Sequence, residues 1–136
     1  GAGRPWANPG ARLDSLWSPF EKAAIRRLVT TGKVVFVDVT ADWCLTCQIN
    51  KSLVLTRGDV YRRLAGDGVV AMQADWTRPD DAISRYLASF GRYGIPFDAV
   101  YGPGTPRGEA LPELLTENAV LEALERAAGP AAVSSN

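Results

Sequence analysis

The stretch VVFVDVTADWCLTC occupies residues 34–47 and contains both cysteines of the chain. Its first seven residues are β-branched or apolar almost throughout, which predicts a central strand covered on both faces of a sheet. A helix is expected to follow, from Cys44 to about Leu55. The two sulfurs therefore stand three residues apart, at the junction of a buried strand and a helix.

This spacing and position favour redox chemistry at the two cysteines. On a helix, residues three apart have Cβ atoms about 5–6 Å from each other, close enough to adjust into a disulfide. Cys44 is predicted at the helix N-terminus, where unpaired N–H groups and the macrodipole favour a thiolate. We therefore expect Cys44 to be the attacking sulfur. Cys47, one turn inside the helix, is expected to be shielded and to resolve the mixed disulfide.

Two other uses of a Cys-x-x-Cys pair have to be considered. A purely stabilising disulfide would close a loop of about four residues, for which chain entropy gives roughly 2 kcal/mol, well below long-loop bridges. Such a bridge would constrain little that the helix does not already constrain. A Cys-x-x-Cys loop can also hold Cu(I) through two thiolates. The only methionine, Met72, is predicted on a distant strand, so a Cu(I)-binding module is the alternative rather than the main hypothesis.

Four further residues are candidates for the same site. Asp38 lies in the middle of the apolar strand, where a lone carboxylate is costly unless it has a partner or a task. It is either a water-linked proton acceptor for the second cysteine or an aspartate with ordinary hydrogen bonds. Trp43 is expected to pack locally and to contact substrate. The Ile95–Pro96 bond, at a strand entrance, is either a plain trans turn or cis; the cis form would place the Ile95 backbone beside the sulfurs, where a substrate strand could pair.

The rest of the chain alternates between predicted helices and strands. The capping pattern of Ser18, Pro19 and Glu21 predicts a helix to about Thr30. Further helices are expected over 59–64, 79–90 and 116–129, and further strands over 69–74, 97–101 and 110–111. The last strands follow each other without a helix. The fold class is therefore α/β, one domain with a central mixed β-sheet flanked by helices on both faces.

Length and composition fit this single domain. The 136 residues are 46% hydrophobic and 22% charged, as in ordinary globular proteins. Residues 1–17 are interpreted as a linker or tag remnant, 18–129 as the domain and 130–136 as a disordered tail. Fifteen basic residues balance fifteen acidic ones, so nucleic acid is not an expected partner. We recognise neither a membrane span nor a signal peptide.

Two features of the composition exclude whole classes of site. The chain has no histidine, which excludes Ser–His and Cys–His catalysis and His-ligated metal sites. Two cysteines cannot form a closed four-thiolate zinc or iron–sulfur site within one chain. We therefore expect no cofactor besides the redox-active Cys44–Cys47 disulfide, and no bound metal.

The order of motifs is similar to that of a known fold. A strand, then Ala41-Asp42-Trp43-Cys44-x-x-Cys47, a helix, a strand, a helix, and Gly94-Ile95-Pro96 before another strand resembles the thioredoxin fold. More narrowly, residues 37–47 resemble the C-terminal periplasmic domain of the transmembrane thiol:disulfide interchange reductases. That family comprises disulfide-bond-formation protein D and the suppressor-of-copper-sensitivity reductases. Residues 75–77, 90–92 and 111–116 resemble the second branch.

The resemblance implies a protein-disulfide reductase that is a soluble periplasmic domain of an inner-membrane protein. A membrane-embedded cysteine pair, expected in the same full-length protein, would donate electrons, and periplasmic thioredoxin-like proteins or domains with disulfides would accept them. The implied roles are nucleophile for Cys44, resolving thiol for Cys47, buried acid for Asp38 and cis-proline for Pro96. A disulfide oxidase or isomerase using the same cysteines is the alternative within this chemistry.

Two departures from the family pattern bear on the redox properties. Leu45-Thr46 replace the Gly-Pro of cytosolic thioredoxins, and because this pair tunes the potential, the direction of electron flow does not follow from them. Family members often carry an acidic residue four positions after the resolving cysteine, where this chain has Lys51. A cation at this position favours a thiolate.

Overall fold

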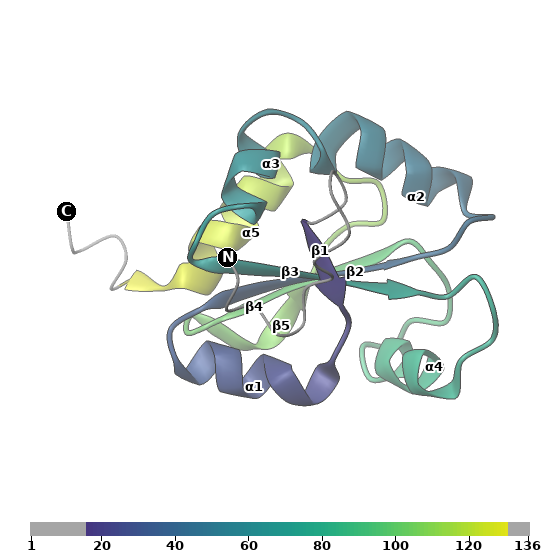
Figure 1. Cartoon of the computed structure of the whole chain (residues 1–136), viewed down its shortest axis with the longest axis horizontal. Helices are drawn as coiled ribbons and strands as arrows, with labels where there is room; N and C mark the ends of the chain where they lie inside the picture. Colours follow the sequence, from purple (N-terminus) through teal and green to yellow (C-terminus); the bar gives the residue numbers. More distant parts are fainter. Residues whose placement is uncertain (1–15, 131–136) are drawn as a thin grey trace.

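The computed structural model describes residues 16–130, which form a five-stranded sheet covered by helices (Figure 1). Neighbouring strands follow the order β1-β3-β2-β4-β5. The first three in this order run parallel, whereas β4 is antiparallel to both β2 and β5. The sheet is therefore mixed, as predicted. The strands are β1 (Trp17–Pro19), β2 (Val34–Thr40), β3 (Val69–Asp75), β4 (Phe97–Gly102) and β5 (Thr105–Ala110).

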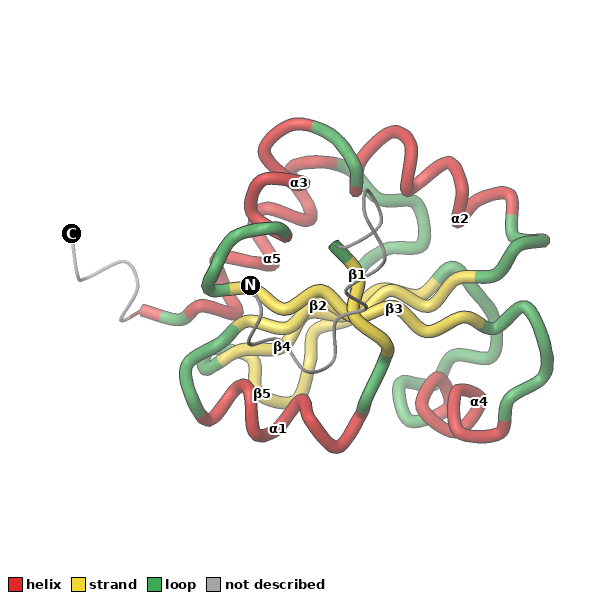
Figure 2. Tube along the Cα trace, in the orientation of Figure 1, coloured by secondary structure: helices red, strands yellow, loops and turns green. Residues whose placement is uncertain are grey.

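Helices lie on both faces of the sheet (Figures 1 and 2). One face is covered by α1 (Lys22–Thr30) and α4 (Asp81–Ala88). The other is covered by α2 (Leu45–Asn50), the π-helical turn η1 (Lys51–Leu55), α3 (Gly58–Leu64) and α5 (Glu117–Ala128). Because successive residues of a strand point to opposite faces, β2 contributes to both cores: Phe36 to the α5 side, Val35 and Val37 to the α1 side.

The N-terminal end of the domain differs from the sequence prediction. Ser18 does not cap a helix, because Trp17–Pro19 form β1 and pair in parallel with β3, while α1 begins only at Lys22. The local capping pattern is outweighed by this non-local pairing. Proline is tolerated there because β1 is an edge strand.

The boundary of the predicted linker moves with β1. Leu16 is buried in the core, and the ring of Trp17 packs against Phe36 with centroids 6.3 Å apart, so both residues belong to the folded domain. The remainder of the predicted linker, residues 1–15, and the predicted tail from residue 131 lie outside the described residues.

Two further elements differ in extent from the predictions. The helix expected over residues 44–55 divides into α2 and η1, because the N–H of Thr56 donates to the Lys51 carbonyl, five residues back. The short strand expected at 110–111 is the end of the six-residue β5, which forms a hairpin with β4. Among residues 16–130, no helix combines the length and the apolar character needed to cross a membrane.

Candidate active site

Cys44 and Cys47 form a disulfide where β2 ends and α2 begins. Their Cα atoms are 5.2 Å apart. Cys44 is the N-cap of α2, and its sulfur accepts the backbone N–H of Cys47 at 3.2 Å. Both residues are buried in this state, Cys44 at 6% and Cys47 at 2% exposure. The predicted position of the two sulfurs at a strand–helix junction is therefore the observed one, and an N–H donor at a helix N-terminus can stabilise a thiolate at Cys44.

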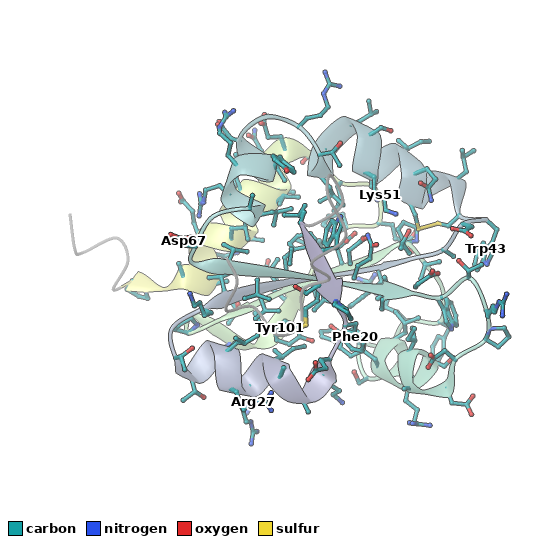
Figure 3. The ribbon with its side chains drawn as sticks, in the orientation of Figure 1. Phe20, Arg27, Trp43, Lys51, Asp67 and Tyr101 are labelled. Carbon is teal, nitrogen blue, oxygen red and sulfur yellow. A yellow bond between two sulfur atoms is a disulfide. The ribbon has the colours of Figure 1, made fainter. Side chains whose placement is uncertain are left out.

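Trp43 stands at the outer edge of the molecule beside the disulfide (Figure 3). Its side chain is 61% exposed, and its indole N–H donates to the Thr77 carbonyl at 3.1 Å. The Asp42 N–H donates to the Thr77 hydroxyl, and that hydroxyl in turn donates to Asp75. Hydrogen bonds from the Thr77 hydroxyl and N–H lower the pKa of the Asp75 carboxyl. This network ties the loop before Cys44 to the loop after β3.

The segment before β4, which contains Ile95 and Pro96, also reaches the two cysteines. Ile95 packs against the cluster formed by Ala41, Cys44 and Cys47. The Ile95–Pro96 peptide bond is cis, so of the two forms left open by the sequence this is the one observed. Pro96 is buried, directly before the first residue of β4. The structure thus brings Ile95 next to the two cysteines, and Pro96 follows it at the entrance to β4.

Asp38 lies on the sheet face that carries α2, with 3% of its surface exposed. Gln73 on β3 donates its side-chain N–H to an Asp38 oxygen at 3.0 Å. Cys47 Sγ lies 4.0 Å from the carbonyl oxygen of Val39, the next residue along β2. Asp38 is therefore buried, hydrogen-bonded and one residue away from the backbone group nearest the Cys47 sulfur.

A second buried carboxyl was not identified from the sequence. Asp98 on β4 is the cross-strand partner of Asp38, and 1% of it is exposed. Burial raises the pKa of Asp98, the Asp38 charge raises it further, and the Lys51 cation opposes both. The signal was available, because Asp98 is an acidic residue within an otherwise apolar strand, as Asp38 is. Gln73 and Thr77 gave no such signal, because their roles depend on the register between strands and on loop packing.

The described part of the chain contains no cluster of side chains that could bind a metal ion. Residues 16–130 contain no group of three or more His, Cys, Asp or Glu side chains able to hold an ion. Met72 is fully buried in the core on the α1 side of the sheet. The chemistry available at the site is that of a dithiol–disulfide couple with two nearby carboxyl groups.

Known proteins are similar to this chain in sequence and in fold. Residues 17–103 match a thioredoxin-like family, Thioredoxin_7. The thiol:disulfide interchange protein DsbD of Ralstonia nicotianae is 33% identical over 110 residues, which cover 72% of this chain and 18% of that protein. The chain therefore spans about a fifth of the length of this relative, and the predicted similarity to the interchange reductases is confirmed.

Solved structures agree with this relationship at the level of the fold. The reduced C-terminal domain of Neisseria meningitidis DsbD aligns with a TM-score of 0.60 at 22% identity, covering 78% of this chain and 92% of that one. A thioredoxin from Thermus thermophilus aligns with a TM-score of 0.62 at 19% identity, covering 88% and 92%. The predicted thioredoxin fold is confirmed. The chain belongs to the thioredoxin-like family and, within it, is similar to the DsbD proteins.

Proposed function

We propose that this chain is a thiol–disulfide oxidoreductase domain that reduces protein disulfides through Cys44 and Cys47. The observation that carries the proposal is the disulfide at the N-terminus of α2, where the Cys44 sulfur is the cap and accepts an N–H donor. A cysteine in this position favours the thiolate, which is the form that attacks disulfides. The similarity to DsbD supports the same chemistry.

The reaction consists of two exchanges. The Cys44 thiolate of the reduced domain attacks one sulfur of a partner disulfide, which forms a mixed disulfide and releases the other partner sulfur as a thiolate that takes up a proton. Cys47 then loses its proton, and its thiolate attacks Cys44 Sγ. The Cys44–Cys47 bond forms, the bond between Cys44 and the partner breaks, and the second partner sulfur leaves. Two electrons pass from the dithiol to the partner.

The surface around Cys44 suits an extended peptide of the partner. Trp43 is held by Thr77 and projects from the surface, and Tyr93 is 82% exposed shortly before Ile95 in the chain. Aromatic side chains that are apolar and yet accessible are typical of residues that contact partners. Ile95 packs against the two cysteines, which supports a role for its backbone in pairing with a peptide strand of the partner.

Donor, acceptor and compartment follow from the similarity to DsbD as proposals. The donor is a membrane-embedded cysteine pair in the same full-length protein, and the acceptors are periplasmic thioredoxin-like proteins or domains that contain disulfides. The domain itself would work in the periplasm. The difference in length between this chain and the Ralstonia relative leaves room for such a membrane part.

Trapping the intermediate tests the order of attack. In Cys47→Ala, the Cys44 thiolate should attack a disulfide-containing thioredoxin-like protein and remain bound to it, because no resolving thiol is present. The adduct is detected by non-reducing electrophoresis and mass spectrometry, and it should disappear on treatment with dithiothreitol. Cys44→Ala is the matched control and should form no such adduct. An adduct formed through Cys47 and not through Cys44 would reverse the assigned roles.

A further inference from the structure

Three adjacent strands place polar side chains side by side on one face of the sheet. In the strand register, Asp38 on β2 lies opposite Gln73 on β3 and opposite Asp98 on β4. The residues two positions away, Phe36 and Val100, belong to the core that η1 and α5 cover, so the polar row points to this same face. The row therefore lies on the side of the sheet from which α2 presents Cys47.

Asp98 is an unusual member of this row. Within residues 16–130, neither of its carboxyl oxygens receives a hydrogen bond from an N–H or hydroxyl donor, although the residue is 1% exposed. Its cross-strand partner is the other buried carboxyl, Asp38. Two carboxyl groups can hydrogen-bond to each other only when one of them carries a proton. Two adjacent buried carboxylates would also repel each other strongly, which again favours one shared proton.

The other ionisable groups around the pair are few. Lys51 extends from η1 toward the sheet (Figure 3), and its charge lowers the pKa of Asp98 against the larger effect of burial. Cys47 on α2 has its Sγ 4.0 Å from the carbonyl oxygen of Val39, the residue after Asp38 on β2. Tyr86, from α4 on the opposite face, feels the Asp98 charge, and burial raises the pKa of Tyr86 far above neutrality. Among the described residues, Lys51 is therefore the one cation that lowers the pKa of Asp98.

We propose that Asp98 is a positioning residue for the resolving step: the ionised Asp38–Asp98 pair accepts the proton of Cys47, and the two carboxyl groups then hold that proton in common. This inference rests on the proposed function, because it concerns the second exchange. The Cys47 thiol gives its proton to the Asp38–Asp98 pair, directly or through one water, and the resulting thiolate attacks Cys44 Sγ. The pair later releases that proton to solvent.

The strength of the acceptor depends on Asp98, because the proton that Cys47 gives up becomes the first proton on the ionised pair. Coupled carboxyl groups titrate as a pair, and the upper of their two ionisations lies above that of an isolated carboxyl. Replacing Asp98 with asparagine removes this upper ionisation while preserving shape and a hydrogen bond to Asp38. Asp38 would then stand between two neutral amides, from Gln73 and from the new asparagine, and would take up the Cys47 proton less readily.

The experiment separates the two exchanges by rapid mixing of the reduced domain with dithiobis(nitrobenzoate), whose released thiolate is coloured. The first release reports attack by Cys44, and the second reports attack by Cys47 on the mixed disulfide. In Asp98→Asn, we expect the second release to slow about tenfold at neutral pH, and its pH profile to lose one inflection. The first release should be unchanged. Glu109→Gln, an acid on β5 paired with Arg126, is the matched control and should match the wild type in both phases.

Two results would overturn the inference. One is an Asp98→Asn variant whose second release has the rate and the pH profile of the wild type. The other comes from the wild type alone: infrared spectroscopy at neutral pH should show the carbonyl band of a buried protonated carboxylic acid, and its absence would exclude the shared proton. Failure of the proposed function looks different, because the wild type itself would then give no second release.

Discussion

The two faces of the sheet each bury a pair of polar groups, and the pairs differ in kind. On the α1 side, the hydroxyls of Tyr86 and Tyr101 lie 2.6 Å apart and hydrogen-bond to each other while uncharged. On the α2 side, Asp38 and Asp98 face each other as carboxyls, and only a proton can join them. One pair is complete in itself, whereas the other depends on pH and on its neighbours.

The surroundings of the two pairs reinforce this contrast. The tyrosines belong to an aromatic cluster in which Phe20, Phe90 and Phe97 pack around Tyr86 at centroid distances of 4.8–5.8 Å. Figure 3 shows Phe20 and Tyr101 on the α1 side and Lys51 on the other. The α2 side combines the carboxyl pair with a cation, a disulfide and a helix N-terminus. We infer that the α1 side stabilises the domain and the α2 side performs its chemistry.

The largest expected effect is a loss of stability, and it tests the α1 side of the sheet. Leu87 on α4 is fully buried among the apolar residues of the α1 side. Leu87→Ala should lower the free energy of unfolding by about 2–5 kcal/mol, because it leaves a cavity. Denaturant titration measures this loss. Both phases of thiol release should keep their wild-type rates while the protein is folded, and a slowed second phase would contradict the division between the faces.

The next effect is on the rate of thiol exchange, and it tests the α2 side of the sheet through Asp38. Asp38→Asn removes the proposed proton acceptor of Cys47 while preserving shape. The second thiol release should slow roughly a hundredfold, within the usual contribution of a positioned base, and more than in Asp98→Asn. Rapid mixing measures both variants side by side. Equal rates for Asp38→Asn and the wild type would make Asp38 a structural residue.

A smaller effect concerns stability and pH at Asp98. Its pKa in the folded protein is raised by burial and by Asp38, so the folded state holds a proton that the unfolded chain releases above about pH 4. Wild-type stability should therefore fall as pH rises from there toward the folded pKa. Asparagine does not titrate, so the advantage of Asp98→Asn should grow by at most about 1.4 kcal/mol per pH unit. A difference independent of pH, from unfolding curves at several pH values, would contradict the raised pKa.

The smallest effect sharpens the comparison from the tyrosine side. Tyr101→Phe leaves the Tyr86 hydroxyl without its partner and should cost about 1–2 kcal/mol of unfolding free energy. This loss should be the same at acidic and neutral pH, because burial keeps both tyrosines neutral by raising the pKa of each. Unfolding curves recorded beside those of Asp98→Asn test this. A loss that changes with pH over that range would remove the contrast between the two pairs.

The sequence was informative where the signal is local. The apolar strand 34–40, the helix after Cys44 and the buried carboxylate Asp38 each follow from a few neighbouring residues, and all are found in the structure. Strand β1 was missed because its pairing partner, β3, lies about fifty residues further along the chain. In that case the local capping pattern at Ser18 indicated the wrong element.

The candidate site divides in the same way. The cysteines, Trp43 and the Ile95–Pro96 segment are recognisable from motifs. The partners of Asp38 depend on strand register, since Gln73 and Asp98 reach it from β3 and β4. The sequence does show Asp98 as an acidic residue in an apolar strand. That it lies opposite Asp38 is known only from the pairing of β4 with β2.

The reduction potential of the Cys44/Cys47 couple tests the central claim most directly. The domain is equilibrated with dithiothreitol or glutathione buffers of known ratio, and the free thiols are counted after alkylation. A reductant should give a potential near or below about −200 mV, on the side of thioredoxins and glutaredoxins. A value near −120 mV, roughly that of a strong disulfide oxidant, would reverse the direction of electron flow. Absence of any reversible couple would contradict the redox function itself.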